Sequence, residues 1–432
     1  MGRGLLLTLL FVPLVARADF DLYGYGPRAA AMAGAMSAEV NDYTAVFYNP
    51  AQMGGREDVN FGFQFQYAGM ISEVQSTTPG RDVRCETCTP PPTVGTSVGL
   101  VLPLGGVVKN RLAFGLGVYL PGAVLLRLHA PSADTPYWYR YQTNPERLQL
   151  HLSAGVKIFD WLKVGAGIQV LANLIGDSAN IGVDLFSKQV TTGEINAYLG
   201  TRVSPVFSLH SQPIKRLRLG ATFRWAMQLD YRIPATVDIE GIGILGFVIS
   251  GTAHFTPHTL QFGAAFDVTE DFTVSLDGQY QAWHMAPTPY VGVARSGPTL
   301  EGLGLGSALD VRSATQPAGF ADTFGGRLGA EYRITERFMV RAGGFYRPTP
   351  VPRQDTAGTN LLDSTTVGAS LGIGFNFPDP LEIFSRPISI DVAGQAHFLL
   401  RREAQKASTD RTPSYSYAAN VIGVTAAIRY DF

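Results

Sequence analysis

The sequence has few charged residues, only two cysteines, and no apolar run long enough to cross a membrane as a helix. Charged residues make up 16% of 432 residues, against about a quarter in a soluble protein. The formal net charge is −1, so nothing indicates a nucleic-acid partner. Since a spanning helix needs about 20 apolar residues, these absences exclude a helical membrane protein and disfavour a soluble globular one.

The scarcity of cysteine limits what the two cysteines can do. Cys85 and Cys88 lie three residues apart, and the chain has no second pair and no nearby histidine to complete a zinc site. In the cytosol this spacing is typical of a redox pair or half a metal site. In an exported chain it favours a small loop disulfide, which we expect here.

The first residues indicate export. Arg3 supplies a positive charge, residues 5–15 are apolar, and Ala16-Arg17-Ala18 has the pattern of a cleavage site. The apolar stretch is too short to span a bilayer, so residues 1–18 are interpreted as a signal peptide cut before Asp19.

What the chain has in abundance is glycine, aromatic residues and alternation. It contains 48 Gly, 18 Tyr and 25 Phe. Apolar and polar side chains alternate over residues 59–67, 148–157, 217–225 and 274–281. Period-two alternation predicts strands with one apolar face, which is typical of membrane barrels.

The alternation predicts about fourteen strands. Short links such as 105–109, 160–161 and 335–336 alternate with long ones such as 122–145, 175–199 and 285–322. Outer-membrane barrels alternate short periplasmic turns with long outer loops in this way. We therefore predict an all-β fold, a transmembrane antiparallel barrel over residues 57–432, with strands near 58–69, 94–104, 110–121, 146–158, 162–174, 200–210, 216–232, 251–267, 272–284, 323–334, 337–348, 364–377, 387–402 and 415–432.

The last predicted strand ends on an aromatic residue, Phe432, after alternating apolar positions. This ending resembles the signal read by the barrel assembly machinery of the outer membrane. The apolar faces predict contact with outer-membrane lipid and lipopolysaccharide, in a Gram-negative cell. No flat extra face indicates a trimer, so we expect a monomer.

Residues 19–56 do not alternate. They are rich in alanine and glycine, with an Ala-rich stretch over 29–36, and precede the first strand. Their size suits a segment that folds back into the barrel, and they are predicted to form a hatch, or plug, in the lumen.

The hatch region resembles the FadL/TodX family of outer-membrane transporters for long-chain fatty acids and aromatic hydrocarbons. The residues that carry the resemblance are Gly24-Tyr25-Gly26-Pro27-Arg28-Ala29, Ala33-Gly34-Ala35, Asp42-Tyr43-Thr44-Ala45, Tyr48-Asn49-Pro50-Ala51 and Gly117-Val118-Tyr119-Leu120-Pro121. The resemblance extends loosely to Phe432 and so covers the whole mature chain. The loops depart from it at the cysteine pair and at residues 300–307.

The resemblance implies a fourteen-stranded barrel, closed by the hatch, that passes a hydrophobic ligand from an outer groove to an internal pocket. The ligand then leaves sideways through a gap made by an inward kink of the third strand. On this sequence the hatch and gate roles fall on Asn49, Pro50 and Ala51, and on the third strand around Gly115 and Gly117.

Candidate ligand contacts are Arg140, Arg218, Arg224, Phe47 and Tyr48. Alternation also points Arg327, Arg333, Arg341 and Arg347 into the lumen. Such arginines either hold a fatty-acid carboxylate or form ion pairs that fill the barrel, with Glu331 and Asp277 as counter-ions; the second interpretation is favoured.

Three loop segments have open interpretations. The aromatic run 137–141 around Arg140 either meets an amphipathic ligand or, as we favour slightly, belongs to the aromatic girdle at the membrane interface. The apolar run 242–248 either lines a capture groove or packs beneath another loop. The glycine-rich run 302–306 follows no parallel strand, so it is interpreted as a loop tip and not as a phosphate loop.

Histidines are scattered without metal spacing, and no spacing identifies a nucleophile. We therefore expect no metal, no cofactor and no catalysis. The favoured function is passive uptake of hydrophobic compounds, long-chain fatty acids or similar. The alternatives are a structural or adhesive barrel without transport, an open porin, which the hatch argues against, and a barrel enzyme.

Overall fold

The computed structural model describes residues 20–85, 88–122, 133–142, 147–184, 189–239, 243–296, 319–356, 358–379 and 386–432. The proposed signal peptide, residues 1–18, and the glycine-rich run 302–306 lie outside these ranges. Within them, no helix combines the length and the apolar character needed to cross a bilayer.

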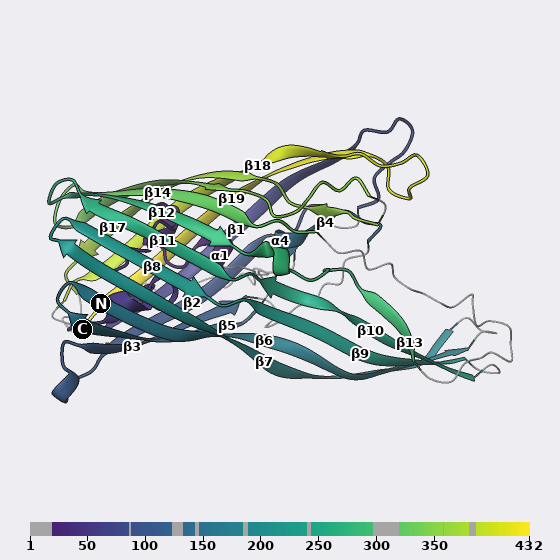
Figure 1. Ribbon diagram of the computed structural model, residues 1–432, viewed down its shortest axis with the longest axis horizontal. Coiled ribbons are helices and arrows are strands. Elements are labelled where there is room, and N and C mark those ends of the chain that lie inside the picture. The colour runs from purple at the N-terminus through teal and green to yellow at the C-terminus, as the bar shows by residue number, and fades with distance from the viewer. Residues whose placement is uncertain are drawn as a thin grey trace, which may run out of the picture.

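Fourteen antiparallel strands close into a barrel (Figure 1). The ring closes where the first strand pairs with the last, from Asn60 opposite Asp431 to Ser76 opposite Tyr415. In ring order the strands are β1 (Asn60–Ser76), β2 (Thr93–Pro103), β3 (Leu112–Pro121), β5 (Gln149–Phe159), β6 (Leu162–Asp184), β7 (Gln189–Ile214), β8 (Leu217–Arg224), β11 (Thr259–Asp267), β12 (Phe272–Gln281), β14 (Thr323–Arg333), β15 (Phe338–Arg347), β17 (Thr366–Phe377), β18 (Ile388–Ala404) and β19 (Tyr415–Asp431).

The predicted fold class and strand number are confirmed. Each predicted strand overlaps one member of the ring, and alternation sorts the side chains as expected. In β1, Phe63 and Phe65 face outward, whereas Gln64 and Gln66 are buried inside. Closure satisfies the backbone hydrogen bonds that an open sheet edge would leave unpaired in lipid.

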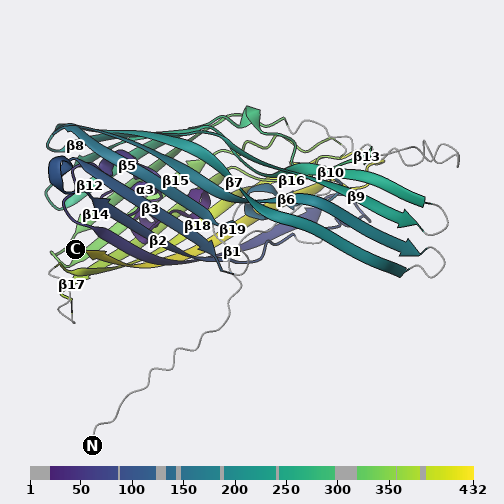
Figure 2. The same ribbon diagram turned by 90° about the horizontal axis from the view of Figure 1, so that it is seen from below.

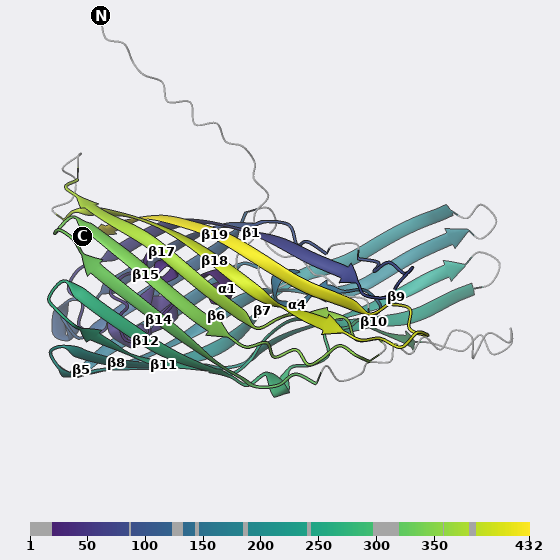
Figure 3. The ribbon, with the colours of Figure 1, turned by 90° about the horizontal axis from the view of Figure 1, so that it is seen from above.

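The two ends of the barrel differ, as the link lengths predict. Residues 160–161 and 334–337 make short turns at the end where the C-terminus lies, and η2 (Gly106–Val108) makes a third (Figure 3). The longer connections gather at the other end. They carry β4 (Tyr137–Trp138), α4 (Tyr139–Gln142), η3 (Trp283–Met285), β13 (Gly292–Ser296) and β16 (Leu361–Leu362).

The prediction of an outer loop over 175–199 is wrong. β6 and β7 continue as a paired hairpin to Asp184 and Gln189, because each strand satisfies the backbone groups of the other. β9 (Met227–Ile239) and β10 (Gly243–Thr256) project with this hairpin beyond the barrel (Figure 2). β9 pairs with β10 and, in parallel, with the upper part of β6.

Two predicted strands are each divided by a break. The stretch predicted as 216–232 is divided at Trp225–Ala226 between β8 and β9, and 251–267 is divided at Pro257–His258 between β10 and β11. The breaks face each other, since the Ala226 amide donates to His258 Nδ1 at 3.1 Å.

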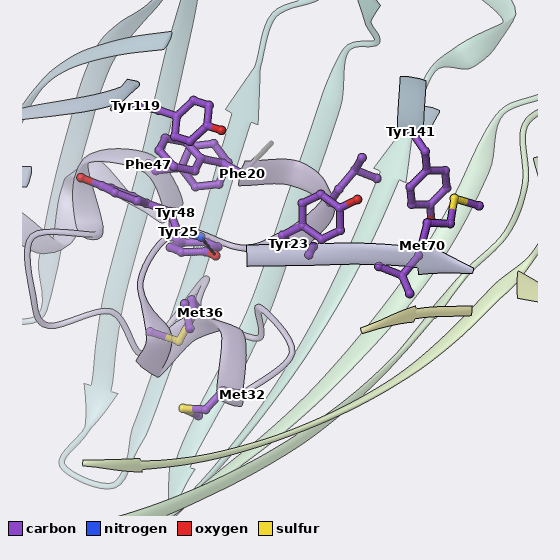
Figure 4. Packing of buried hydrophobic residues seen from close by; sticks show 14 of the residues in the cluster. Phe20, Tyr23, Tyr25, Met32, Met36, Phe47, Tyr48, Met70, Tyr119 and Tyr141 are labelled. Atoms are coloured by element: carbon purple, nitrogen blue, oxygen red, sulfur yellow. Dashed lines mark hydrogen bonds between the residues drawn. The ribbon is translucent and has the colours of Figure 1, made fainter. Parts of the chain in front are cut away.

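Residues 20–56, called the inner segment below, lie inside the barrel. They form α1 (Phe20–Tyr23), α2 (Pro27–Ala31), α3 (Ala45–Tyr48) and η1 (Pro50–Met53). The segment carries much of the main buried cluster, and Figure 4 shows Phe20, Tyr25, Phe47 and Tyr48 close to Tyr119 of β3. Its alanines and glycines permit close approach to the wall.

Candidate functional site

One side of the inner segment is held to the wall by charged groups. Arg28 of α2 is buried and pairs with Glu331 of β14 (Nε–Oε2, 2.8 Å) and with Glu39 (Nη2–Oε1, 2.9 Å). Glu331 also accepts from Arg341 of β15, and Glu39 also accepts from Arg218 of β8. We call these five residues the tether network.

Several of the arginines predicted to face the lumen form ion pairs. Arg218 pairs with Glu39 at 2.7 Å and with Asp267 at 2.5 Å, and Arg341 pairs with Asp391 at 2.5 Å. Arg333 pairs with Asp271 near a short turn, and both are exposed. These arginines therefore take part in ion pairs, as the favoured interpretation predicts. Of the two expected counter-ions, Glu331 forms ion pairs with arginines. Asp277 instead accepts hydrogen bonds from Ser37 and Gln261.

Small residues on this same side let α2 lie directly on the strands. A Cβ on Gly343 of β15 would lie 2.5 Å from the Met32 carbonyl carbon and 2.6 Å from the Ala33 nitrogen. A side chain at this position would thus push the inner segment off the wall.

The other side of the inner segment, α3 and η1, is held by neutral hydrogen bonds and by one arginine. Wall groups bond almost every residue from 46 to 51. The bonds are Ser153 Oγ to Val46 O (3.1 Å), Arg224 Nη2 to Phe47 O (2.5 Å), Thr222 Oγ1 to Tyr48 O (2.7 Å), Asn49 Nδ2 to Leu209 O (3.0 Å) and Ala51 N to Ser208 Oγ (2.8 Å).

Asn49 is fully buried and joins three parts of the molecule. Its Oδ1 accepts from the Ala51 amide at 3.1 Å and so caps η1, where Pro50 occupies the first position. Its Nδ2 donates to Ser37 O within the inner segment at 2.6 Å and to Leu209 O of β7. The Asn-Pro-Ala element thus bonds β7, and the backbone of η1 also lies close to β5 and β6.

Arg224, Phe47 and Tyr48 meet at one place. The Arg224 guanidinium carbon lies 4.2 Å from the centre of the Phe47 ring, and the Phe47 and Tyr48 rings are 5.0 Å apart. His151 of β5 contacts the Phe47 ring edge-on at 5.3 Å. Since a guanidinium over an aromatic face is attracted to it, Arg224 positions Phe47 through both its ring and its carbonyl.

Beside this cluster, the inner face of the wall carries a row of small residues. Gly115 of β3 lies opposite Ser153 of β5, which lies opposite Gly167 of β6. A Cβ on Gly115 would overlap Val46 Cγ2 and lie 2.5 Å from Met53 Sδ. Gly117 lies two residues further along β3, close to the Tyr25 hydroxyl. Val46 and Met53 therefore cover the small-residue row from inside.

The outer face of the same strands is hollowed. Ala154 and Ala166 lie opposite each other on the lipid-facing side of β5 and β6, and larger residues surround them. The resulting pocket has a volume of about 520 Å³ and a mostly apolar lining. Its lining is Leu100, Leu102, Phe114, Gly115, Leu116, Leu152, Ser153, Ala154, Ala166, Gly167 and Ile168.

The pocket thus reaches the small-residue row from outside, while Val46 and Met53 of the inner segment lie against Gly115 of that row from inside. β3 pairs with both β2 and β5 without a register shift, so the backbone ladder is closed here. The family resemblance assigned Gly115 to the gate. The alignment with Ser153, and the roles of Val46, Met53, Ala154 and Ala166, depend on the register between strands and on the fold of the inner segment.

Arg140 lies far from this site, at the mouth. It belongs to residues 133–142, called the mouth strap. Its Nε lies 3.6 Å from Asp363 Oδ2 and its guanidinium 5.1 Å from the Trp283 ring. Burial lowers the pKa of Arg140, and Asp363 opposes this effect. Its Nε and Nη2 have no hydrogen-bond partner within the described part of the chain.

The favoured assignment of residues 137–141 to a membrane girdle is wrong. All five side chains are buried within the protein, since the strap packs inside the ring of outer connections. The run 242–248 was expected in a loop, but β10 begins at Gly243; Ile242 lies outside the described residues. Cys85 and Cys88 are joined by a disulfide, with their Cα atoms 5.3 Å apart.

Comparison with known proteins adds a family. The family model described as "Outer membrane protein transport protein (OMPP1/FadL/TodX)" matches residues 22–432. Alkane uptake protein A of Marinobacter nauticus is 22% identical over 413 residues, covering 88% of this chain and 84% of that protein.

Solved structures share the fold. A FadL homologue of Pseudomonas aeruginosa has a TM-score of 0.62 and 15% identity, with 97% of this chain and 98% of that chain covered. The toluene transporter TodX of P. putida has a TM-score of 0.58 and 17% identity, with 95% and 99% covered.

Proposed function

Because the chain belongs to the outer-membrane transport protein family (OMPP1/FadL/TodX), we propose that it carries hydrophobic compounds inward and releases them sideways through the wall at the small-residue row. Membership makes the chain a transport protein of the outer membrane and not an enzyme. The substrate class and the lateral route are our proposals.

The observation that carries the proposal is the apolar pocket on the outer face, whose floor is the small-residue row. Its lining is almost free of polar groups, so a hydrocarbon chain would be stabilised there by roughly 25 cal/mol per Å² of apolar surface removed from water. A water-filled pore offers no such gain. A downhill gradient is then sufficient to drive uptake.

The inner segment supports a hatch role for residues 19–56. It lies inside the lumen, and Val46 and Met53 cover the small-residue row. We propose that release requires these two side chains to move away and the β3–β5 ladder to part locally at Gly115. Asn49, Pro50 and Ala51 position that gate through β7, while Gly115 and Gly117 provide the space.

The ligand would meet Arg140 at the mouth and then Phe47, Tyr48 and Arg224 beside the gate. Arg218 is held by two carboxylates, so we propose for it a role in holding the hatch. Long-chain fatty acids, alkanes and monoaromatic compounds all suit an apolar pocket. The names of the relatives, an alkane uptake protein and toluene transporters, support this range.

The proposal is tested by a substitution that fills the outer pocket. Ala166→Phe places a ring in the hollow, and Ala342→Phe, its matched control, places one on the outward face of β15 on the other side of the barrel. Both variants are assembled in liposomes, and uptake of oleate, hexadecane and toluene is measured with radiolabels.

We expect Ala166→Phe to reduce uptake at least about tenfold, and Ala342→Phe to leave it unchanged. Equal uptake by both variants and the unmodified protein would contradict the lateral route. No uptake of any compound by the unmodified protein, together with no co-purified hydrophobe by mass spectrometry, would favour a structural barrel instead.

A further inference from the structure

The mouth strap separates two buried hydrophobic clusters. Trp138 and Tyr141 belong to the main buried cluster, where the centre of the Trp138 ring lies 5.8 Å from that of Tyr417. Tyr137 and Tyr139 point into a second cluster, where Tyr139 contacts Phe320 at 5.1 Å. The strap therefore crosses the mouth between outer and inner apolar surfaces.

One end of the strap is fastened to the outer connections by backbone bonds. The Tyr137 amide donates to Asn360 O at 3.0 Å, and β4 pairs in parallel with β16. Thr412 Oγ1 donates to Asp134 O at 2.6 Å. These contacts hold residues 133–138 on the side of β17 and β19.

The Trp138 side chain is fastened differently, by the loop that carries the disulfide. Its indole Nε1 donates to the Cys88 carbonyl at 2.8 Å, and Ser72 Oγ of β1 donates to the same oxygen. The sulfur of Cys85 lies 3.8 Å from Pro136 O. Because Trp138 is fully buried, its N–H depends on this carbonyl for its partner.

The Cys85–Cys88 bond closes a small ring that passes through the nitrogen, Cα and Cβ of Cys88. The Cys88 carbonyl carbon is attached to this ring at Cα, so ring closure limits where the carbonyl group can lie. We propose that this disulfide acts as a staple: it fixes the Cys88 carbonyl under the Trp138 indole and so holds the mouth strap closed across the lumen. The effect of the strap on uptake rests on the proposed function; the staple itself does not.

Reduction provides the direct test. A dithiol such as dithiothreitol supplies two electrons and two protons, the S–S bond breaks into two thiols, and the reagent becomes its cyclic disulfide. The Cys88 carbonyl is then free to turn, the buried indole loses its partner, and the strap loosens. On the barrel wall, the bond from Ser72 Oγ to the same carbonyl is then lost as well.

The experiment is hydrogen exchange by mass spectrometry on the full-length protein in nanodiscs, with and without dithiothreitol. We expect amides of residues 137–142 to exchange at least about tenfold faster after reduction, with residues 27–36 unchanged. The double variant Cys85→Ser/Cys88→Ser exchanges fast in both conditions and does not respond to the reagent.

Two further variants test whether the change in exchange depends on the Trp138 hydrogen bond. Trp138→Phe retains the ring but not the N–H, and it is expected to exchange fast even with the disulfide intact. Arg411→Gln removes an exposed ion pair to Asp134 of the same strap and is expected to change nothing. Slow exchange in reduced protein, or equal exchange in every variant, overturns the staple.

Uptake by the same samples separates this inference from the proposed function. Faster uptake by reduced protein supports the strap as a closed lid. Faster exchange with unchanged uptake contradicts that role of the strap. Absence of uptake in both redox states, with the exchange difference present, contradicts the proposed function and leaves the staple intact.

Discussion

The two sides of the barrel hold the inner segment by different chemistry. On β14 and β15, Arg28 of the inner segment forms a buried ion pair with Glu331, and Glu331 also pairs with Arg341. On β3, β5 and β6, the contacts are van der Waals contacts and neutral hydrogen bonds around Gly115 and Ser153. A buried charge cannot leave its partner without a large cost, whereas an apolar contact can be exchanged for a ligand. For the proposed gate, we therefore call the first the fixed side and the second the movable side.

The largest effect is expected from removing the central carboxylate of the fixed side. Glu331→Gln leaves Arg28 and Arg341 buried with less charge compensation, which costs about 3–5 kcal/mol when a buried pair is broken. The inner segment should detach, and liposomes should become permeable to small sugars. Liposome swelling measures this, with a deletion of residues 19–54 as the fully open reference; unaltered permeability would show that the charges are dispensable.

A pair of glycine substitutions compares the two sides directly. Gly115→Ala and Gly343→Ala each add a methyl group against the inner segment, at a cost of about 1–3 kcal/mol for overpacking. We expect both to lower the urea midpoint of unfolding, but only Gly115→Ala to change hydrophobe uptake. Loss of uptake in both variants would mean that the two sides are not functionally different.

Asn49→Ala tests the attachment of the movable side. The change removes the cap of η1 and leaves Ser37 O and Leu209 O without this donor, for a cost of about 1–3 kcal/mol. Hydrogen exchange of residues 45–54 should accelerate while residues 27–36 keep their rate. Equal acceleration in both stretches would contradict the separate attachment of the two sides.

The smallest effect is expected at Arg224, the charged side chain of β8 that bonds α3. Arg224→Lys retains the charge but loses the planar group that lies over Phe47, for about 0.5–2 kcal/mol. Uptake should change by less than about tenfold, with no leak of sugars. A leak as large as that of Glu331→Gln would show that Arg224, like the tether network, is needed to keep the inner segment in the lumen.

Much of the fold could be predicted from the sequence, because alternation and link length report directly on strands in a barrel. The family resemblance, drawn from segments such as Gly24–Ala29 and Tyr48–Ala51, is confirmed by the family model. The hairpin of β6 and β7 was missed, since its polar, glycine-containing stretch pairs only because a neighbouring strand is present. The preference of a segment for strand conformation depends on the strands that lie beside it.

The candidate site was less predictable. Asn49 and Gly115 could be chosen by resemblance, but Val46 and Met53 carry no signal in the sequence. Whether Ala154 lies opposite Ala166 depends on the register between β5 and β6, and the local sequence pattern of one strand does not predict that register. The buried mouth strap was misassigned because an aromatic run around an arginine has the same composition as a membrane girdle.

The break between β8 and β9 has a mechanical consequence. Arg224 is the last residue of β8, and its side chain holds the Phe47 carbonyl inside the lumen. Trp225 and Ala226 follow at once and lead into the sheet that projects beyond the barrel (Figure 2). The projecting strand β9 therefore begins at Met227, three residues after a side chain that bonds the inner segment, and under the proposed function a displacement of the sheet would be transmitted to Phe47 through Arg224.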